Sequence, residues 1–592
     1  MSQSDKDQRI QNAISLFTSG QIKECLKATS KLAQTYPNEP FLYNLLGVAS
    51  ATEHQFEEAI AFYNKAIKLA PQYVEVLNNM GVAYNDWKKP DLALKILDQA
   101  IDLNPIYAEA YNNRGNAQRA LSDLGSAIKD YQKAIEINPS YLDALSNLGN
   151  SLSENRDYAN AKNIYKKALS LDPGNLELNF YMADCLFNNR EYARAENLIL
   201  EIRDNIGENA KFLNLYGKVL QKKGSLKALN FFKRSLKNHH DKEEVLNNIG
   251  TFLLEKRKIC SAIRVFKKLL EGNRKNFLAK LNLSYCLLIK KDLEKGWRYY
   301  EYRWYADTNV NVVWPFDKDK IWKGEEGGEL VLWREQGIGD DILFLGMAPE
   351  AKRKVSKLSV YVDPRLVPLC ERSMHDIEFI PTEEKLKEKH FDYHLPMGSL
   401  PLHFRNSEEE FSKTMRGYLK ADRKRVEALR EELGVKGKRV VGISWKSFNG
   451  SNMENKNLNL RDLAILFKDL DITLVNLQYG DVEDELREFS QSTGVNILQC
   501  SSVDNRDDLD GLAALIELCD LVVSTSNVTI HLAGALGKET WVLLPFVSAS
   551  WWLLDREDSV WYPSMKLFRQ NLYNEWDDVL TNIKCELLRR FA

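Results

Sequence analysis

Small and apolar residues in the first half of the chain recur with a period of 34 residues. One register holds Ala13, Gly47, Gly81, Gly115, Gly149, Ala183 and Gly217; a second, twelve positions later, holds Ala59, Ala93, Ala127, Ala161 and Ala195; a third holds Pro37, Pro71, Pro105, Pro139 and Pro173. Within a unit the apolar positions follow helical spacing, as Leu45, Val48, Ile60 and Tyr63 do. The pattern predicts two amphipathic helices per unit that approach closely at the small residues and end before the proline.

These positions resemble those of the tetratricopeptide repeat, with its small residue, alanine, aromatic residue and proline in order. Units starting near residues 40, 74, 108 and 142 match well, and Gly250 and Ser284 mark later, more divergent units. We therefore expect about nine repeats over residues 1–305. Since one helix pair cannot bury its apolar face alone, the repeats should stack into a superhelix with a groove that binds peptides.

Asparagines recur on the first helices of the units. The positions are Asn44, Asn78, Asn112, Asn147, Asn214 and Asn247. The resemblance implies that they face the groove and hydrogen-bond the backbone of a bound chain. The alternative is that they are ordinary solvated helix positions.

Apolar runs of strand length alternate with helical segments after residue 329. The predicted strands are 330–333, 358–362, 377–381, 439–445, 472–478, 495–498, 521–524 and 540–545. Such alternation is typical of a parallel α/β sheet. A charged helical stretch at 420–438 divides the region, so we expect a connector at 306–328, a Rossmann-like lobe at 329–419, a linker helix at 420–438 and a second such lobe at 439–592. Ligands bind at the carboxyl ends of the strands in folds of this class.

Composition narrows the function classes. The 592 residues carry a net charge of -2, which gives no basic footprint for nucleic acid. The eight cysteines form no CxxC pair and no zinc-ligand spacing, and the sequence contains neither HExxH nor a Walker-type loop. We expect a soluble cytoplasmic protein without a membrane span, a bound metal or a cofactor.

The string EQGIGD at 335–340 follows the first predicted strand. Gly337 and Gly339 make the turn and are candidates for ligand binding, and Asp340 begins a helix, where a carboxylate is positioned to act on a ligand. The same residues also suit a turn and a helix cap, with Asp340 or Asp341 as the capping side chain.

A second string, STSNVTIHLAGALGK at 524–538, places a helix start directly after a strand. The unpaired N–H groups of a helix start attract phosphate, and Ser526, Asn527 and Thr529 could add side-chain contacts. His531 is one helical turn further on; it either contacts the ligand or packs against the sheet.

Further candidates for ligand binding follow neighbouring strands. Lys446 and Lys456 could neutralise a phosphate, although each could equally be an ordinary surface lysine. Gln478 and Tyr479, at the end of the strand ITLVNLQ, are candidates for contact with a base or ribose.

The strings EQGIGD, NLQYGD, NVTIHLAGALGK and WYPSMKLFRQ, read in order, resemble bacterial tetratricopeptide-repeat glycosyltransferases over residues 296–578. The sheet region is similar to heptosyltransferases, and the layout to O-GlcNAc transferase. The resemblance implies a GT-B fold of two Rossmann-like lobes, metal-independent inverting transfer from a nucleotide-sugar co-substrate, and an acceptor protein held by the repeats. Flagellin is an acceptor of some relatives with this layout.

The resemblance also assigns roles to residues. It makes Asp340 the general base and gives Thr529 and His531 to donor phosphate binding. The chain departs from many relatives at Ser526-Asn527, where they have aspartate and threonine, and at Lys456, where they have arginine. Two alternatives stay open: a peptide-binding adaptor whose sheet region no longer catalyses, and an enzyme that glycosylates a glycan or lipid.

Overall fold

The computed structural model describes residues 3–238, 242–306, 316–413, 416–447, 456–468 and 470–591. The chain divides into two compact units, residues 1–239 and residues 240–592, which we call the repeat unit and the sheet unit. The sequence places the end of the repeats at residue 305, and the helical repeats do continue to Tyr300. The division into compact units nevertheless falls earlier, so the last two repeats belong to the sheet unit.

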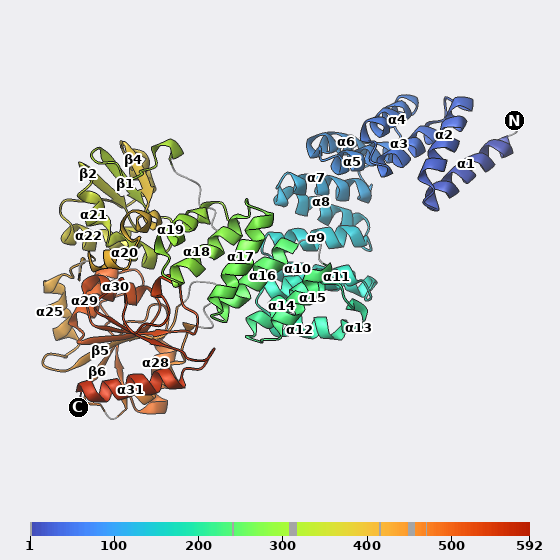
Figure 1. Ribbon diagram of the computed structural model, residues 1–592. Helices are drawn as coiled ribbons and strands as arrows, with labels where there is room; N and C mark the ends of the chain where they lie inside the picture. Colours follow the sequence, from blue (N-terminus) through green and yellow to red (C-terminus); the bar gives the residue numbers. More distant parts are fainter. Residues whose placement is uncertain are drawn as a thin grey trace. The chain divides into compact units, whose positions relative to one another are not determined.

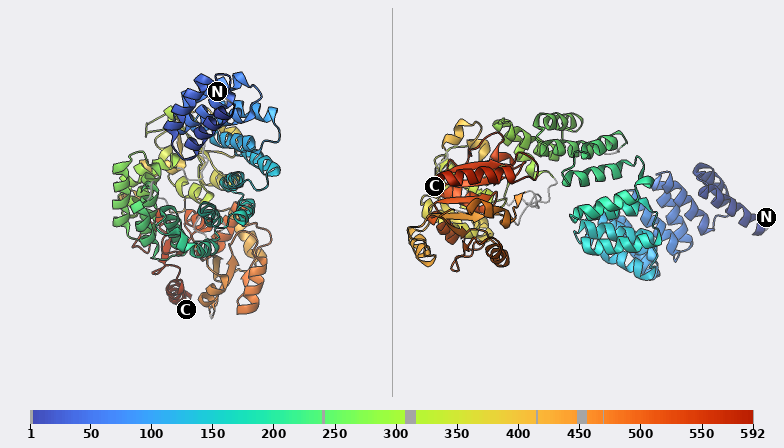
Figure 2. Two further views of the ribbon diagram at one scale, coloured as in Figure 1. Left: turned by 90° about the vertical axis from the view of Figure 1, so that its right-hand side faces the viewer. Right: turned by 90° about the horizontal axis from the view of Figure 1, so that it is seen from below.

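Helices pair along the repeats as the 34-residue period predicts, and Figure 2 shows successive pairs lying side by side. The described residues contain nine pairs: α1 (Gln3–Thr18) with α2 (Ile22–Thr35), α3 (Pro40–Thr52) with α4 (Phe56–Leu69), α5 (Val74–Asp86) with α6 (Pro90–Leu103), α7 (Ala108–Ala120) with α8 (Leu124–Ile137), α9 (Leu142–Glu154) with α10 (Tyr158–Leu171), α11 (Leu176–Asn188) with α12 (Tyr192–Glu201), α14 (Ala210–Lys222) with α15 (Ala228–Asn238), α16 (Lys242–Glu255) with α17 (Ile259–Gly272), and α18 (Phe277–Ile289) with α19 (Leu293–Tyr300). A short helix, α13 (Arg203–Ile206), follows α12.

The recurring small residues lie where the two helices of a pair touch. A Cβ atom added at Gly149 would be 2.5 Å from the ring of Tyr165, and one added at Gly115 would be 2.6 Å from Tyr131. The alanines of the second register are fully buried, and the prolines follow the second helix of each pair by two residues. The periodic residues therefore set the spacing within each pair.

After the last repeat, the sheet unit contains two parallel sheets with flanking helices (Figure 1). The first sheet has the order β3-β2-β1-β4, with β1 (Glu329–Trp333), β2 (Lys357–Tyr361), β3 (Glu378–Ile380) and β4 (Tyr393–Pro396). The second has the order β10-β9-β8-β5-β6-β7, with β5 (Val440–Ser444), β6 (Thr473–Asn476), β7 (Ile497–Leu498), β8 (Leu521–Thr525), β9 (Thr540–Leu544) and β10 (Met565–Arg569). All pairings between the named strands are parallel, for example Leu332 with Val360 and Gly442 with Val522, and an isolated antiparallel bridge joins Asp558 to Lys566 of β10. The prediction of parallel sheets is confirmed.

Both faces of the second sheet are covered, which explains its continuous apolar strands. The helices α25 (Arg423–Glu432), α29 (Leu509–Leu518) and α30 (Val528–Leu536) share one apolar core with the strands, and α27 (Leu460–Phe467), α28 (Glu483–Thr493) and α31 (Asp577–Phe591) share the other. The first sheet is flanked by α20 (Ile338–Leu345), α21 (Ala348–Lys352), α22 (Val367–Ser373), α23 (Glu383–Lys387) and α24 (Pro401–Phe404).

Strand order reverses once in each sheet. In the first sheet the reversal lies between β1 and β4, and in the second between β5 and β8. The loop 334–337 follows β1, and residues 526–527 follow β8. Both predicted ligand-binding strings therefore lie at the positions where open parallel sheets form a crevice for ligands.

Candidate functional site

The two predicted helix starts face each other in the structure. A Cβ atom added at Gly339, in the first turn of α20, would be 3.0 Å from Cδ2 of His531 and 3.6 Å from its Nε2 atom, in the first turn of α30. A side chain at 339 would hold these helices apart. The absence of one allows the string after β1 and the string after β8 to meet.

Asp340 lies beside this contact. Burial raises the pKa of its carboxyl group to about 6, against the effect of the Gly337 backbone amide, which lowers it. Glu335 raises the pKa further and Lys456 lowers it. Burial lowers the pKa of Lys456, and Asp340 acts in the opposite sense. The structure thus brings together Asp340, Lys456 and the start of α30, which are far apart in the sequence.

His531 is buried, with 7% of its surface exposed. Its Nδ1 atom lies 3.1 Å from the hydroxyl of Tyr562, and its ring packs beside that of Trp552 at a centroid distance of 5.6 Å. Burial lowers its pKa to about 3, so the imidazole is neutral near pH 7. The ring joins the two helix starts, and Nε2 is the nitrogen on the side of Gly339.

Three of the predicted donor-binding side chains have partners within the protein. Asn527 caps α30 by accepting from the Thr529 amide at 3.0 Å and donates to the Ser444 hydroxyl at 2.7 Å. The Gln478 amide oxygen accepts from Ser444, Trp445 and Lys446, and the Thr529 hydroxyl donates to the Leu477 carbonyl. These side chains tie the ends of β5, β6 and β8 together. The other first-turn amides of α30, like those of any α-helix, have no partner within the helix.

The remaining four predicted positions differ from one another in their surroundings. Lys446 forms an ion pair with Glu485 of α28, which directs its ammonium group toward that helix. The Tyr479 hydroxyl lies 3.5 Å from that of Ser447, and Ser526 is half-buried in the bend before α30. Gly337 is exposed at the start of α20.

The last repeat is joined to the loop after β1. The Gln336 amide donates to the Tyr300 hydroxyl at 2.7 Å, and Arg303 donates to both carboxylate oxygens of Glu335 at 2.7 and 2.9 Å. Arg303 belongs to the 3-10 turn Glu301–Trp304 that ends the repeats. A buried bidentate pair of this kind holds the loop that carries Asp340 in one geometry.

A cavity of about 570 Å³ lies between the last repeat and this loop. Its walls include Leu281, Tyr285, Tyr300, Trp304, Asp340 and Trp551. Tyr285, Tyr300, Arg303 and Glu335 were not among the predicted site residues. The aromatic string GWRYYEYRW at 296–304, where the composition of the chain changes, is the signal for Tyr300 and Arg303. Glu335 begins the string EQGIGD, and no pattern singles out Tyr285.

The recurring asparagines bond to one another across neighbouring repeats. Asn44 accepts from Asn79 at 3.1 Å, and the corresponding pairs are Asn78 with Asn113, Asn112 with Asn147 and Asn247 with Asn282. Asn214 is also buried. Asn112 and Asn147 line a polar groove of about 640 Å³ in the repeat unit, together with Tyr165 and Tyr181. The asparagines therefore form a ladder between repeats, which separates them from ordinary solvated positions.

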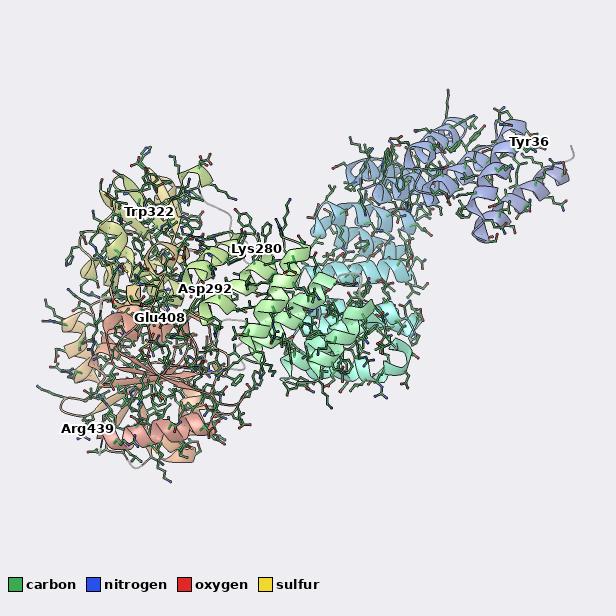
Figure 3. The ribbon with its side chains drawn as sticks, in the orientation of Figure 1. Tyr36, Lys280, Asp292, Trp322, Glu408 and Arg439 are labelled. Atoms are coloured by element: carbon green, nitrogen blue, oxygen red, sulfur yellow. The ribbon has the colours of Figure 1, made fainter. Side chains whose placement is uncertain are left out.

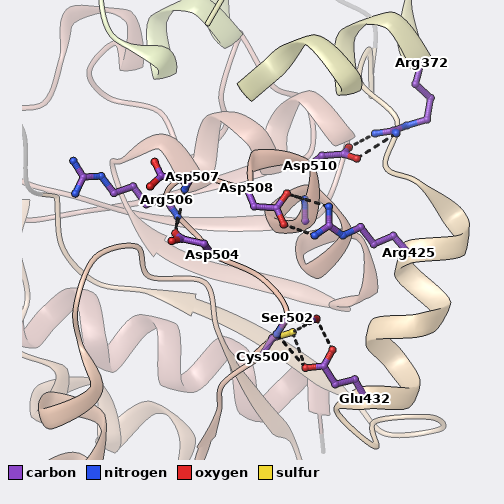
Figure 4. A network of polar contacts seen from close by, with 11 residues as sticks. Arg372, Arg425, Glu432, Cys500, Ser502, Asp504, Arg506, Asp507, Asp508 and Asp510 are labelled. Carbon is purple, nitrogen blue, oxygen red and sulfur yellow. Dashed lines mark hydrogen bonds and ion pairs between the residues drawn. The ribbon is translucent and has the colours of Figure 1, made fainter. Parts of the chain in front are cut away.

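Polar contacts connect the segments around the two sheets. Arg372 of α22 pairs with Asp510 of α29, Arg425 of α25 pairs with Asp508, and Glu432 accepts from Ser502 (Figure 4). Glu408, labelled in Figure 3, pairs with Lys291 at 2.9 Å and with Arg556 at 3.0 Å. The last repeat and both sheets are thereby linked within one compact unit.

Among the described residues, no three or more metal-ligating side chains lie together. None of the described helices combines the length and the apolar composition that crossing a bilayer requires.

Comparison with known proteins identifies the repeats. Models of the tetratricopeptide repeat match residues 54–86, 74–107, 108–141, 130–163 and 152–219. The chain therefore contains tetratricopeptide repeats, which commonly bind proteins. Among solved structures, it is similar to a tetratricopeptide repeat protein from Parabacteroides merdae, with 20% identity over 42% of this chain and 99% of that one and a TM-score of 0.35. A MamA structure from Desulfovibrio magneticus is 23% identical over 28% of this chain and 95% of that one, with a TM-score of 0.26.

A curated relative is Protein FlbA from Caulobacter vibrioides, which is 31% identical over 320 residues. The alignment covers 50% of this chain and 52% of FlbA, so the chain spans about half the length of the curated relative that it matches.

Proposed function

We propose that the chain is an inverting glycosyltransferase of GT-B type, which transfers a sugar from a nucleotide-sugar to a serine or threonine hydroxyl of a protein recruited by the repeats. Flagellin, an acceptor of some relatives with this layout, is one candidate for that protein. The observation that carries the proposal is the contact of Gly339 with His531, because it places the carboxylate of Asp340 beside the helix start that follows β8. Both lie at the strand-order reversals of their sheets.

In the proposed reaction, Asp340 accepts the proton of the acceptor hydroxyl. The hydroxyl oxygen forms a bond to the anomeric carbon while the bond from that carbon to the phosphate oxygen breaks, and the nucleotide leaves as an anion. Its charge is stabilised by the first-turn amides of α30 and by Lys456. A raised pKa suits a general base, since efficiency is greatest when the pKa lies near the working pH.

The structure modifies the assignment of the donor contacts. Asn527, Thr529 and Gln478 act by holding the strand ends, and Lys446 has to leave Glu485 before it can reach a phosphate. We therefore assign the phosphate to Lys456 and the backbone of α30.

A thermal-shift screen of the full chain against UDP-, GDP-, ADP- and CMP-linked sugars tests the proposal. A bound donor raises the melting temperature, and a labelled sugar then becomes attached to protein. Lys456→Ala should lose the thermal shift, whereas Lys468→Ala, at an exposed position at the end of α27, should keep it. If none of these donors shifts the melting temperature, the enzyme proposal is wrong.

The second candidate is a protein-binding adaptor without activity. The tetratricopeptide repeats and the polar groove of the repeat unit support it. Capture of a protein partner together with no turnover of any nucleotide-sugar would favour this reading.

A further inference from the structure

The last repeat and the segment that follows β1 together build the cavity beside Asp340. Leu281 and Tyr285 come from α18, Tyr300 from α19 and Trp304 from the turn that follows. Trp551 comes from the 3-10 turn Ser550–Trp552, which follows β9 of the second sheet. Tyr285 and Trp551 are half-buried, so their rings form walls and are not sealed in the core.

The side chains assigned to the donor phosphate do not line this cavity. Lys446, Lys456, Ser526, Asn527 and His531 are absent from its walls, whereas Asp340 is part of them. Of the predicted donor-binding positions, Gly337 lines the cavity, beside Asp340. In an inverting transfer, the base touches the acceptor hydroxyl and the phosphate departs from the other side of the sugar. The cavity therefore lies on the acceptor side of Asp340.

The two cationic groups around the cavity are already engaged by carboxylates. Arg303 contacts both oxygens of Glu335 and pairs with Glu301 at 2.7 Å, and Lys456 acts on Asp340. An anionic guest would therefore lose water without gaining a free cationic partner, and a cationic guest would have to compete with Arg303 and Lys456 for their carboxylates, which is costly in an aromatic pocket. An uncharged guest meets several aromatic rings, which favour apolar and aromatic groups.

Resting on the proposed function, we infer that this cavity is an acceptor subsite and takes an uncharged apolar or aromatic side chain of the acceptor polypeptide, next to the serine or threonine that is modified. The last tetratricopeptide repeat is then part of the active site and sets its sequence preference.

The test uses the full chain and short, fluorescein-labelled, serine-centred peptides in which each flanking position is varied. Binding by fluorescence anisotropy should select apolar or aromatic residues and discriminate against Asp, Glu, Lys and Arg. Tyr285→Ala and Trp551→Leu should weaken the preferred peptide roughly ten- to a hundredfold, the range for removing contacts in an apolar pocket. Tyr285→Phe should retain the preference. Tyr302 belongs to the same 3-10 turn as Trp304, but its ring does not line the cavity. Tyr302→Ala should therefore leave binding unchanged.

Equal peptide selectivity in Tyr285→Ala and the unmodified chain would overturn the inference. Enrichment of charged residues would overturn it as well, and so would Tyr285-dependent binding of oligosaccharides in place of peptides. The donor screen is a separate readout: intact peptide selectivity without donor binding supports the subsite and contradicts the proposed transferase function.

Discussion

Asp340 combines a location at the start of a helix with a buried environment that disfavours its charge. Its pKa of about 6 lies above the ordinary 3.8. Since only the ionised form accepts a proton, we expect transfer to rise with pH through about 6. Asp340→Asn should lower turnover by roughly 10²–10⁴-fold, the usual contribution of a general base, while donor affinity persists. A pH–rate profile of kcat/KM checks this, and an unchanged rate in the variant would remove Asp340 from the mechanism.

The same pKa predicts the effect of Asp340→Asn on stability. A carboxyl group whose pKa is raised on folding destabilises the folded state at pH values above that pKa, where its charged form is buried. Removing the charge should therefore raise the melting temperature at pH 8. The gain should fade as the pH falls through 6 toward 3.8, because the carboxyl group is then protonated in both states. A melting temperature that is lower than that of the unmodified chain at pH 8 would contradict this assignment.

Gly339 allows the starts of α20 and α30 to approach closely. Its added Cβ would be 3.0 Å from the His531 ring, so Gly339→Ala should separate α20 from α30 and cost about 1–3 kcal/mol in the free energy of unfolding, as overpacking does. Gly337→Ala is the matched control, because the nearest atom is 3.8 Å away and its φ of −78° suits alanine. Chemical denaturation of both variants decides; equal stability would show that the helix starts do not need this contact.

Among the elements, the repeat helices depend on small residues at one register. Gly149→Ala places a Cβ 2.5 Å from the Tyr165 ring and should destabilise the repeat unit by more than 1 kcal/mol. Gly125→Ala, at an exposed helical position of α8, should stabilise by about 0.5–1 kcal/mol, because alanine loses less backbone entropy than glycine. Thermal unfolding of the two variants should give shifts of opposite sign.

How far the sequence predicts these elements depends on how local their determinants are. The repeats are predictable because every unit carries its own small residues and closing proline. The apolar core strands are equally plain. Strands β4 and β10 were not predicted because each mixes polar and apolar residues. Strand β4 contains His394, whose ring is buried and contacts the Asp317 carbonyl. Strand β10 lies at the edge of its sheet and contains Lys566 and Arg569.

The candidate site, too, is predictable from the sequence only where its determinants are local. The two helix starts could be located because a strand, a turn and a helix follow one another in the chain. The partners of the side chains could not, because they come from distant segments. Gln478 serves the backbone of residues 445–446, Lys446 pairs with Glu485, and Tyr300 holds Gln336. No spacing rule connects such pairs.

At the scale of the whole chain, the division near residue 240 separates the repeats into two groups with different surroundings. The last repeat shares an apolar core with the sheets, through Leu281, Leu288, Leu293, Trp297 and Tyr300. The Trp297 indole also donates to the Arg405 carbonyl at 2.8 Å, and Arg257 donates to the carbonyls of Phe546 and Gln570. These repeats act as a structural part of the sheet unit as well as a continuation of the superhelix.

A fragment spanning residues 240–592 should therefore unfold in one cooperative transition, whereas a fragment beginning at residue 306 should be much less stable or insoluble. The shorter fragment exposes the surface covered by Trp297, a side chain whose removal typically costs about 3–5 kcal/mol, and leaves the carboxylate of Glu335 buried without Arg303. Circular dichroism melts of the two fragments measure the difference. Equal melting temperatures would show that the sheets fold without the repeats.

If the proposed function is correct, the fragment 240–592 should keep donor hydrolysis while losing transfer to a protein that needs the groove of the repeat unit. This outcome would separate the catalytic role of the last repeats from the recruiting role of the first seven.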